Sequence, residues 1–179
     1  MTFMQPQLTY PAAAAACALM GSVTDVKSRR IPNLITAPAF LFGLLLHLFL
    51  GGWKQMLEAL AAGLICGIIF LVFYIAGGMG AGDVKLITAV GTITGWSHNV
   101  AYTLVLTAIT GGVMAIVLAL ARGRLKQTLM NVGDIASHHK QAGLQPHPDL
   151  NLKNVQTLRL PYALAIAGGS VLTLYFQFQ

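Results

Sequence analysis

Long stretches of this chain carry no charged side chain, and this feature limits the possible folds more than any other. Asp, Glu, Lys and Arg are all absent from residues 1–24, 31–53, 59–82, 86–121 and 160–179. A helix needs about 20 apolar residues to cross the hydrocarbon core of a bilayer. Only 9% of the 179 residues are charged, whereas a soluble domain carries roughly 25%. The sequence therefore predicts an all-α, polytopic membrane protein.

Turn-forming residues divide these apolar stretches into about six transmembrane helices. The breaks fall at Pro32 and Asn33, at Gly51 and Gly52, from Gly77 to Gly82, and from Ser97 to Asn99. The fourth helix has about 14 residues and would rise only about 21 Å, less than the roughly 30 Å hydrocarbon core, so a re-entrant segment is its alternative. The expected helices are 8–24, 33–51, 57–77, 84–97, 100–121 and 158–176.

Basic residues are distributed unevenly between the expected loops, and this predicts the orientation. With six crossings and the N-terminus outside, ten of the eleven Lys and Arg residues lie on the inner side, and only Lys54 lies outside. If the fourth helix did not cross, the six basic residues from Arg122 onward would lie opposite the first three. We therefore expect a multi-pass protein of the bacterial inner membrane with its N-terminus outside.

The net charge of +6 fits the same membrane interpretation. Anionic lipid headgroups attract Lys and Arg on cytoplasmic loops, so membrane lipids are the expected partners. A nucleic-acid surface would combine basic residues with aromatic ones, and no such combination is visible. A signal peptide at residues 1–24 is disfavoured because no Lys or Arg precedes Lys27.

A polar loop at about 122–157 is the one sizeable hydrophilic region of an expected single domain, 1–179. Leu125, Leu129, Val132 and Ile135 recur in it at helical spacing, with polar residues between them. This pattern predicts a short amphipathic helix that lies in the membrane interface. Prolines at positions 146 and 148 would end it.

Five acidic residues are present, and two of them are candidates for chemistry. Asp134 and Asp149 belong to the polar loop, and Glu58 is expected near the outer headgroups. Asp25 and Asp83 instead fall at the cytoplasmic ends of apolar helices, where an acid is a functional candidate. Each alone could be a helix cap or a partner for a basic residue. Together they resemble the pair of an aspartic protease, in which one carboxyl holds a proton and the other activates water.

Helix dipoles suggest a division of roles between the two acids. Asp83 precedes an expected helix, whose N-terminus favours an ionised carboxylate, whereas Asp25 follows the C-terminal end of the first helix. On this basis Asp83 is the expected base and Asp25 the expected acid. Basic residues after Asp25 oppose this assignment, and titration belongs to the pair.

A glycine-rich segment, 77–85, leads directly into Asp83. Its glycines permit positive φ angles and close approach of another backbone. A plain interhelical turn is one reading, and a phosphate cradle is excluded because the GK[ST] sequence of a Walker A motif is missing. A loop that presents an acid beside a peptide-binding cleft fits the segment better.

Three segments together resemble the type IV prepilin peptidases and the related archaeal preflagellin peptidases. The segment from Asp25 to Asn33, DVKSRRIPN, looks like the first aspartate motif of the family, in which Ile-Pro-Asn begins six residues after the Asp. Gly78 to Lys85, GMGAGDVK, looks like the second motif, GxGxGDxK. Leu160 to Ala167, LPYALAIA, is similar to the start of the last family helix.

This resemblance implies a membrane aspartyl endopeptidase that removes the short basic leader of a prepilin and leaves the apolar pilin helix in the bilayer. It makes Asp25 and Asp83 the catalytic pair and Gly78, Gly80, Gly82 and Lys85 substrate-binding or loop residues. Lys85 would either anchor the loop at the headgroups or tune the pair. These candidates are Asp25, Asp83, Gly78, Gly80, Gly82 and Lys85.

The zinc-binding CxxC domain that many family members carry does not fit in the short segment between Asp25 and Ile31. The chain is therefore similar to the short form that serves Flp/Tad-type pili. No cofactor and no metal are expected, and the oligomeric state is left open. Cys17 and Cys66 are expected to be small buried residues without a disulfide or zinc role.

Two alternatives remain at this point. A small ion- or proton-coupled transporter could use Asp25 and Asp83 as carriers, although such residues tend to lie near the midplane of the membrane. A metal site could involve His138, His139, His147 and Asp149, but their spacing matches no zinc pattern.

Overall fold

The structure, a computed structural model, describes residues 6–145 and 160–177, and these residues form helices without any strand. The all-α prediction is confirmed for this part of the chain. Each expected apolar helix is present, with ends shifted by a few residues. The helices are α1 Pro6–Ser28, α2 Asn33–Ile75, α3 Ala81–Thr94, α4 His98–Ala121, α5 Leu125–Ala142 and α6 Tyr162–Gln177.

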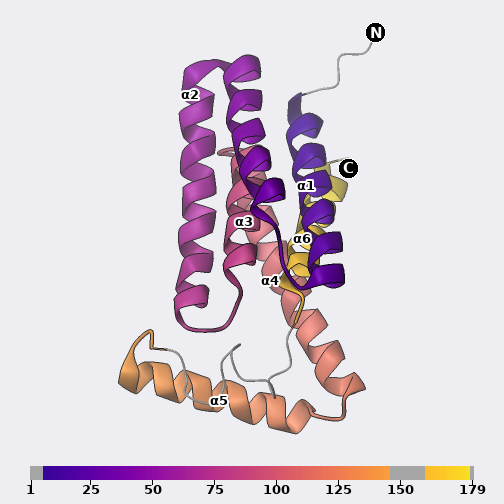
Figure 1. The fold of residues 1–179 in the computed structure, drawn as a ribbon, viewed down its shortest axis with the longest axis vertical. Coiled ribbons are helices and arrows are strands. Elements are labelled where there is room, and N and C mark those ends of the chain that lie inside the picture. Colours follow the sequence, from indigo (N-terminus) through magenta and orange to yellow (C-terminus); the bar gives the residue numbers. More distant parts are fainter. Residues whose placement is uncertain (1–5, 146–159, 178–179) are drawn as a thin grey trace.

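Helix α2 contains two of the expected helices, joined by a sharp bend. Gly52 has φ 78° and ψ −177°, a conformation outside the helical region that glycine adopts without steric cost. The two halves therefore run antiparallel, as Figure 1 shows. The break predicted at Gly51 and Gly52 is confirmed.

Helix α3 occupies the centre of the bundle. It packs most extensively against α2 and also against α1, while α6 packs against both α1 and α4 (Figure 1). Leu86, Ile87, Val90 and Ile93 of α3 are almost completely buried. This burial explains how so short a helix is accommodated, because neighbouring helices surround it.

Small residues allow the helices to approach α3 closely. A Cβ atom added at Gly91 of α3 would lie 2.7 Å from Sγ of Cys66, and one added at Gly21 of α1 would lie 2.7 Å from Cδ1 of Leu86. Such small residues are typical of helix interfaces in membranes. The close packing fixes the ends of α1 and α3 relative to each other.

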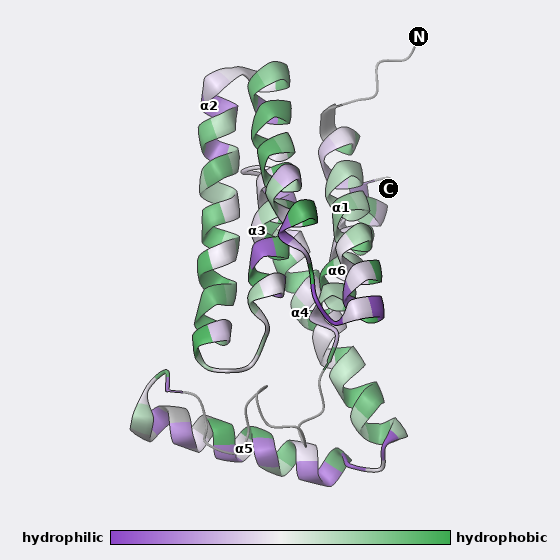
Figure 2. Cartoon of the chain, viewed as in Figure 1, coloured by the Kyte–Doolittle hydropathy of each residue, from purple (hydrophilic) through white to green (hydrophobic). Residues whose placement is uncertain are grey.

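Many apolar side chains lie on the outside of the bundle, and the mostly green ribbons of α2 and α4 in Figure 2 show how apolar these helices are. Phe49 is 80% exposed, and Ile68, Ile109 and Val117 are each more than half exposed. Among the described helices, α2 and α4 are long and apolar enough to cross a membrane, and α6 is a shorter apolar helix. A water-soluble protein would not leave such a large apolar surface open.

Helix α5 lies across one end of the bundle, nearly at right angles to the other helices (Figure 1). The helix predicted inside the polar loop is therefore confirmed. Leu129 and Val132 are exposed on it. The prolines at 146 and 148, together with His147 and Asp149, lie outside the described residues.

Candidate functional site

Asp25 and Asp83 line the same pocket at the end of the bundle that faces α5. Asp25 lies in the last turn of α1 and Asp83 in the first turn of α3. The pocket has a volume of about 300 Å³. The residues that line it come from the end of α1, the connection to α2 and the start of α3: Asp25, Arg29, Arg30, Ile31, Gly80, Ala81, Gly82 and Asp83. The structure thus brings together two acids that are 58 positions apart in the sequence.

The Asp83 carboxyl group is buried, and only one of its oxygens is hydrogen bonded. Asp83 is 9% exposed. The backbone N–H of Gly80 donates a hydrogen bond of 3.2 Å to Oδ2, which caps the start of α3. The other oxygen, Oδ1, is buried and has no hydrogen-bond partner among the described residues. A buried polar atom without a partner costs free energy and is a typical feature of a functional site.

Two glycines of the second motif shape this pocket. A Cβ atom added at Gly80 would lie 3.2 Å from Oδ2 of Asp83, and one added at Gly82 would lie 3.2 Å from Cβ of Ile31. Both distances are tight, so side chains at these positions would displace Asp83 or the segment after Asp25. Gly78 has a different place: its N–H donates to the carbonyl of Phe73 at 2.9 Å, in the turn that ends α2.

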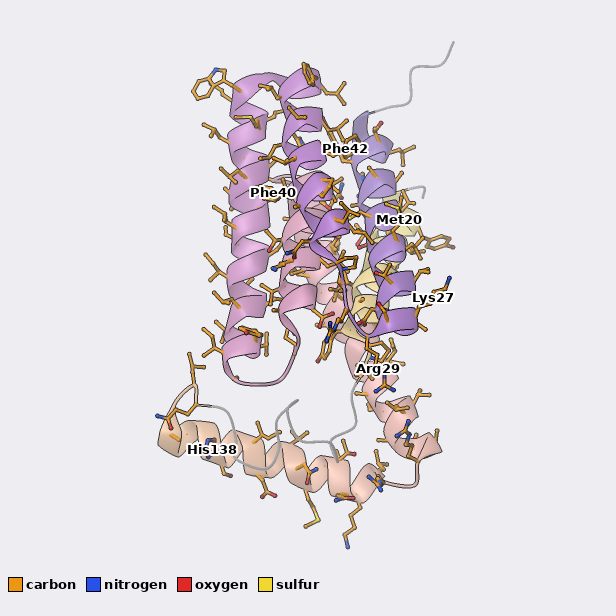
Figure 3. The ribbon with its side chains drawn as sticks, in the orientation of Figure 1. Met20, Lys27, Arg29, Phe40, Phe42 and His138 are labelled. Carbon is orange, nitrogen blue, oxygen red and sulfur yellow. The ribbon has the colours of Figure 1, made fainter. Side chains whose placement is uncertain are left out.

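The connection from α1 to α2 holds the first acid in place. The N–H of Arg29 donates to the backbone carbonyl of Asp25 at 2.7 Å. Arg29 has φ 51°, and it is the only residue other than glycine with a positive φ among those described. A non-glycine residue in this region is strained, and such strain often accompanies functional sites. Figure 3 shows Arg29 below the last turn of α1, beyond Lys27.

Lys85 joins the two motifs. Its Nζ atom donates a hydrogen bond of 2.9 Å to Oδ1 of Asn33, at the start of α2. Lys85 is exposed and does not line the pocket. The contact connects α3, which carries Asp83, to the segment that follows Asp25.

The pKa values of both acids are raised, and Asp83 is affected more strongly. Both residues lie outside the expected spanning segments 8–24 and 84–97. Burial and then the nearby Asp25 carboxylate raise the pKa of Asp83 from 3.8 to about 6, against the opposing effect of the Gly80 N–H. Burial also raises the pKa of Asp25, which is less enclosed. One carboxyl therefore makes it harder for the other to ionise.

The burial of Asp83 acts against the ionised form that the helix dipole favours. Asp83 does lie at a helix N-terminus, as predicted, but loss of water around its carboxyl outweighs the dipole and the hydrogen bond from Gly80. The raised pKa of Asp83 favours its protonated form, while titration belongs to the pair of acids. Burial is not visible in the sequence, so the roles inferred from helix dipoles did not include it and stay a prediction.

The other candidates do not belong to this pocket. The described residues contain no group of three His, Cys, Asp or Glu side chains able to hold a metal. Two members of the alternative metal site, His147 and Asp149, lie outside the described residues. Cys17 and Cys66 are buried free thiols in the helical core, as predicted.

Sequence reasoning missed the roles of Arg29, Arg30 and Asn33. The two arginines line the pocket, and Asn33 accepts the hydrogen bond of Lys85. All three lie within the first motif, so their position beside Asp25 was the available clue. Their contact with the second motif depends on the packing of α1, α2 and α3, which the sequence does not display.

Comparison with known proteins agrees with the arrangement of the site. The model of the type IV leader peptidase family matches residues 12–116, more than half of the chain. The matched span includes Asp25, Asp83 and the helices that carry them. No curated protein and no solved structure matches the chain. With its two acids at one end of an apolar helical bundle, the chain belongs to the type IV leader peptidase family.

Proposed function

We propose that this chain is an aspartyl endopeptidase that removes the basic leader of Flp-type prepilins at the cytoplasmic face of the inner membrane. The observation that carries the proposal is the shared pocket of Asp25 and Asp83. The buried Oδ1 of Asp83 supports it, because a water molecule or a substrate carbonyl could supply the hydrogen bond that this atom lacks among the described residues. Family membership supports peptidase chemistry.

In the proposed reaction, the two acids divide the proton transfers. Ionised Asp25 accepts a proton from water, and the water oxygen attacks the scissile carbonyl carbon. Protonated Asp83 donates its proton to the carbonyl oxygen, which gives a tetrahedral diol. When the C–N bond breaks, Asp25 returns its proton to the leaving amine nitrogen and Asp83 recovers a proton from a diol hydroxyl. Both acids then have their starting charges.

Six crossings with the N-terminus outside are part of the proposal. The spanning segments would lie within α1, the two halves of α2, α3, α4 and α6, with Asp25 and Asp83 just outside them at the cytoplasmic ends of α1 and α3. Helix α3, with 14 residues, would rise only about 21 Å, but its burial supports a crossing because little of it would contact lipid. Under this topology the pocket lies on the cytoplasmic side, where α5 would rest in the lipid headgroups as part of a single 1–179 domain.

The position of the pocket also bears on the transporter alternative. A carrier acid is expected near the midplane of the membrane. Asp25 and Asp83 lie at the ends of their helices, close to the basic residues Lys27, Arg29 and Arg30. This location favours a substrate that is cut at the membrane surface.

A cleavage assay tests the proposal. Full-length protein is reconstituted in liposomes with a Flp-type prepilin that carries its leader, in the absence of any ion gradient. Asp25→Asn and Asp83→Asn should each abolish cleavage and leave membrane insertion intact. Asp134→Asn is the matched control, since it removes an exposed carboxylate of α5 that does not line the pocket of Asp25 and Asp83. Full cleavage by both Asp variants would contradict the proposal.

A further inference from the structure

A second pocket of about 280 Å³ lies at the opposite end of the bundle. It is formed where the first turns of α1, the bend of α2, the end of α3 and the last turn of α6 meet. Tyr10 and Asp25, which line the two pockets, are 15 residues apart on α1 and thus separated by about 20 Å along the helix. The proposed cleavage reaction gives this second pocket no role.

His47 forms the buried wall of this pocket. Its ring is 5% exposed, stacks on Tyr10 at a centroid distance of 4.2 Å, and has Nε2 3.0 Å from the carbonyl oxygen of Ile93. A carbonyl oxygen can only accept, so Nε2 carries the hydrogen. The Nδ1 atom of the neutral ring is then a hydrogen-bond acceptor.

The other described lining residues are also rich in acceptors and contain no Lys or Arg. Glu58 supplies a carboxylate, and Gln55, Asn99 and Gln177 supply amide groups. The Asn99 and Gln177 amides already bond to each other, with Nε2 of Gln177 donating to Oδ1 of Asn99 at 2.5 Å. The described lining therefore has a formal charge of −1 when His47 is neutral.

Aromatic faces complete the lining. Tyr10 lies against His47, and Trp96 is 58% exposed at the turn between α3 and α4. The face of an aromatic ring attracts a cation, and Trp is enriched at the membrane–water interface. One carboxylate and one imidazole are too few protein ligands for a typical metal site, whereas aromatic faces with acceptors and a negative charge suit an organic cation.

We propose that this second pocket binds a primary ammonium group, carried either by an ethanolamine lipid headgroup or by a free small amine. The Glu58 carboxylate would accept a charge-assisted hydrogen bond from the ammonium, and the ring of Trp96 would cover it. The volume of about 280 Å³ suits a headgroup or small amine better than a larger ligand. The inference is independent of the peptidase proposal, since it uses none of its residues.

Lipid binding tests this inference on the full-length protein. The protein is stripped of lipid in detergent and mixed with phosphatidylethanolamine or with phosphatidylglycerol, and bound lipid is counted by native mass spectrometry. The wild type should bind phosphatidylethanolamine at least about tenfold more tightly than Glu58→Gln does, whereas phosphatidylglycerol, which the basic loops attract, should bind equally to both proteins. Asp134→Asn, which removes an exposed carboxylate from α5, is the matched control and should bind like the wild type.

A second arm separates the two sources of the ammonium group. Soluble ethanolamine should raise the melting temperature of the wild type and leave that of Glu58→Gln unchanged if the amine alone is sufficient. Binding of the lipid without any effect of ethanolamine would assign the site to the headgroup. Trp96→Ala gives a second variant, with an expected loss of phosphatidylethanolamine binding of several-fold. Equal binding of phosphatidylethanolamine by Glu58→Gln and wild type, or an equal loss of phosphatidylglycerol binding in Glu58→Gln, would overturn the inference.

Discussion

The two ends of the bundle hold pockets of similar volume, about 300 Å³ and about 280 Å³. The pockets differ in whether their buried polar side chain is hydrogen bonded and packed. At one end, Asp25 and Asp83 repel each other and Oδ1 of Asp83 lacks a hydrogen-bond partner among the described residues. At the other end, buried His47 bonds to a carbonyl and stacks on Tyr10. An unsatisfied buried acid costs stability, and the proposed chemistry of Asp83 gives this cost a reason.

Geometry at the acidic end should be sensitive to one added methyl group. Gly80→Ala places a Cβ atom 3.2 Å from Oδ2 of Asp83 and so displaces the carboxyl. Because this contact requires a shift of only a few tenths of an ångström, we expect the cleavage rate to fall about tenfold, less than the roughly 100-fold loss that a displacement of about 1 Å causes. Gly112→Ala in α4, where an added Cβ meets nothing within 4 Å, should cleave normally. Equal rates for the two variants would show that the position of Asp83 is unimportant.

The burial of Asp83 should lower the free energy of unfolding of the wild type relative to Asp83→Asn, by an amount that depends on pH. Because the pKa of Asp83 is raised from 3.8 to about 6, its folded form prefers the proton, and stability is lost as the pH rises through 6. Asp83→Asn removes this loss and should unfold with a free energy about 2–3 kcal/mol higher than wild type at pH 8. Below pH 4 the gain should vanish. Thermal unfolding at both pH values measures it.

The pH dependence of the cleavage rate should show whether the Asp83 carboxyl must carry a proton. If Asp83 must be protonated, kcat/KM should fall about tenfold per pH unit above its pKa of about 6. The acid limb should lie above the ordinary pKa of an aspartate, since burial also raises the pKa of Asp25. Initial rates measured from pH 4 to 9 test this. A rate that stays flat from pH 6 to 9 would contradict a shared proton.

The smallest expected effect concerns the link between the motifs. Lys85→Met removes the hydrogen bond from Nζ to Asn33 and should lower kcat several-fold with little change in KM, because the contact is exposed and positions the pair indirectly. Lys85→Arg should restore part of the rate. Lys54→Met is the control, because it removes an exposed positive charge near the bend of α2, at the opposite end of the bundle, and should leave kcat unchanged. A change in KM alone would instead assign Lys85 to substrate binding.

The positions of the helices were easier to predict from the sequence than the contacts between them. Charge-free stretches and the glycines at 51 and 52 located the helices and the bend, because spanning length and turn chemistry are local properties. The α3 helix nevertheless ends at Thr94 because Gly95 adopts φ 74° and terminates it earlier than expected. Pairing of Asp25 with Asp83 was predicted through the motifs and the loop positions.

Other features of the site depend on contacts between distant segments. The Lys85–Asn33 hydrogen bond joins residues 52 positions apart. The burial of Asp83 arises from the packing of α3 among other helices, and it raises the pKa of this acid against the effect of the helix dipole. The positive φ of Arg29 follows from the tight connection between α1 and α2. None of these features leaves a periodic pattern in the sequence.

Proximity of the two acids in the membrane is the most direct test of the account. Cysteines are placed at Asp25 and Asp83 in a background with Cys17→Ala and Cys66→Ala, and a short bifunctional thiol reagent is added to the protein in liposomes. The account predicts an intramolecular cross-link between positions 25 and 83 in high yield, and none between positions 25 and 58, which lie at opposite ends. Failure of the first pair to react, or equal yields for both pairs, would contradict a shared catalytic pocket.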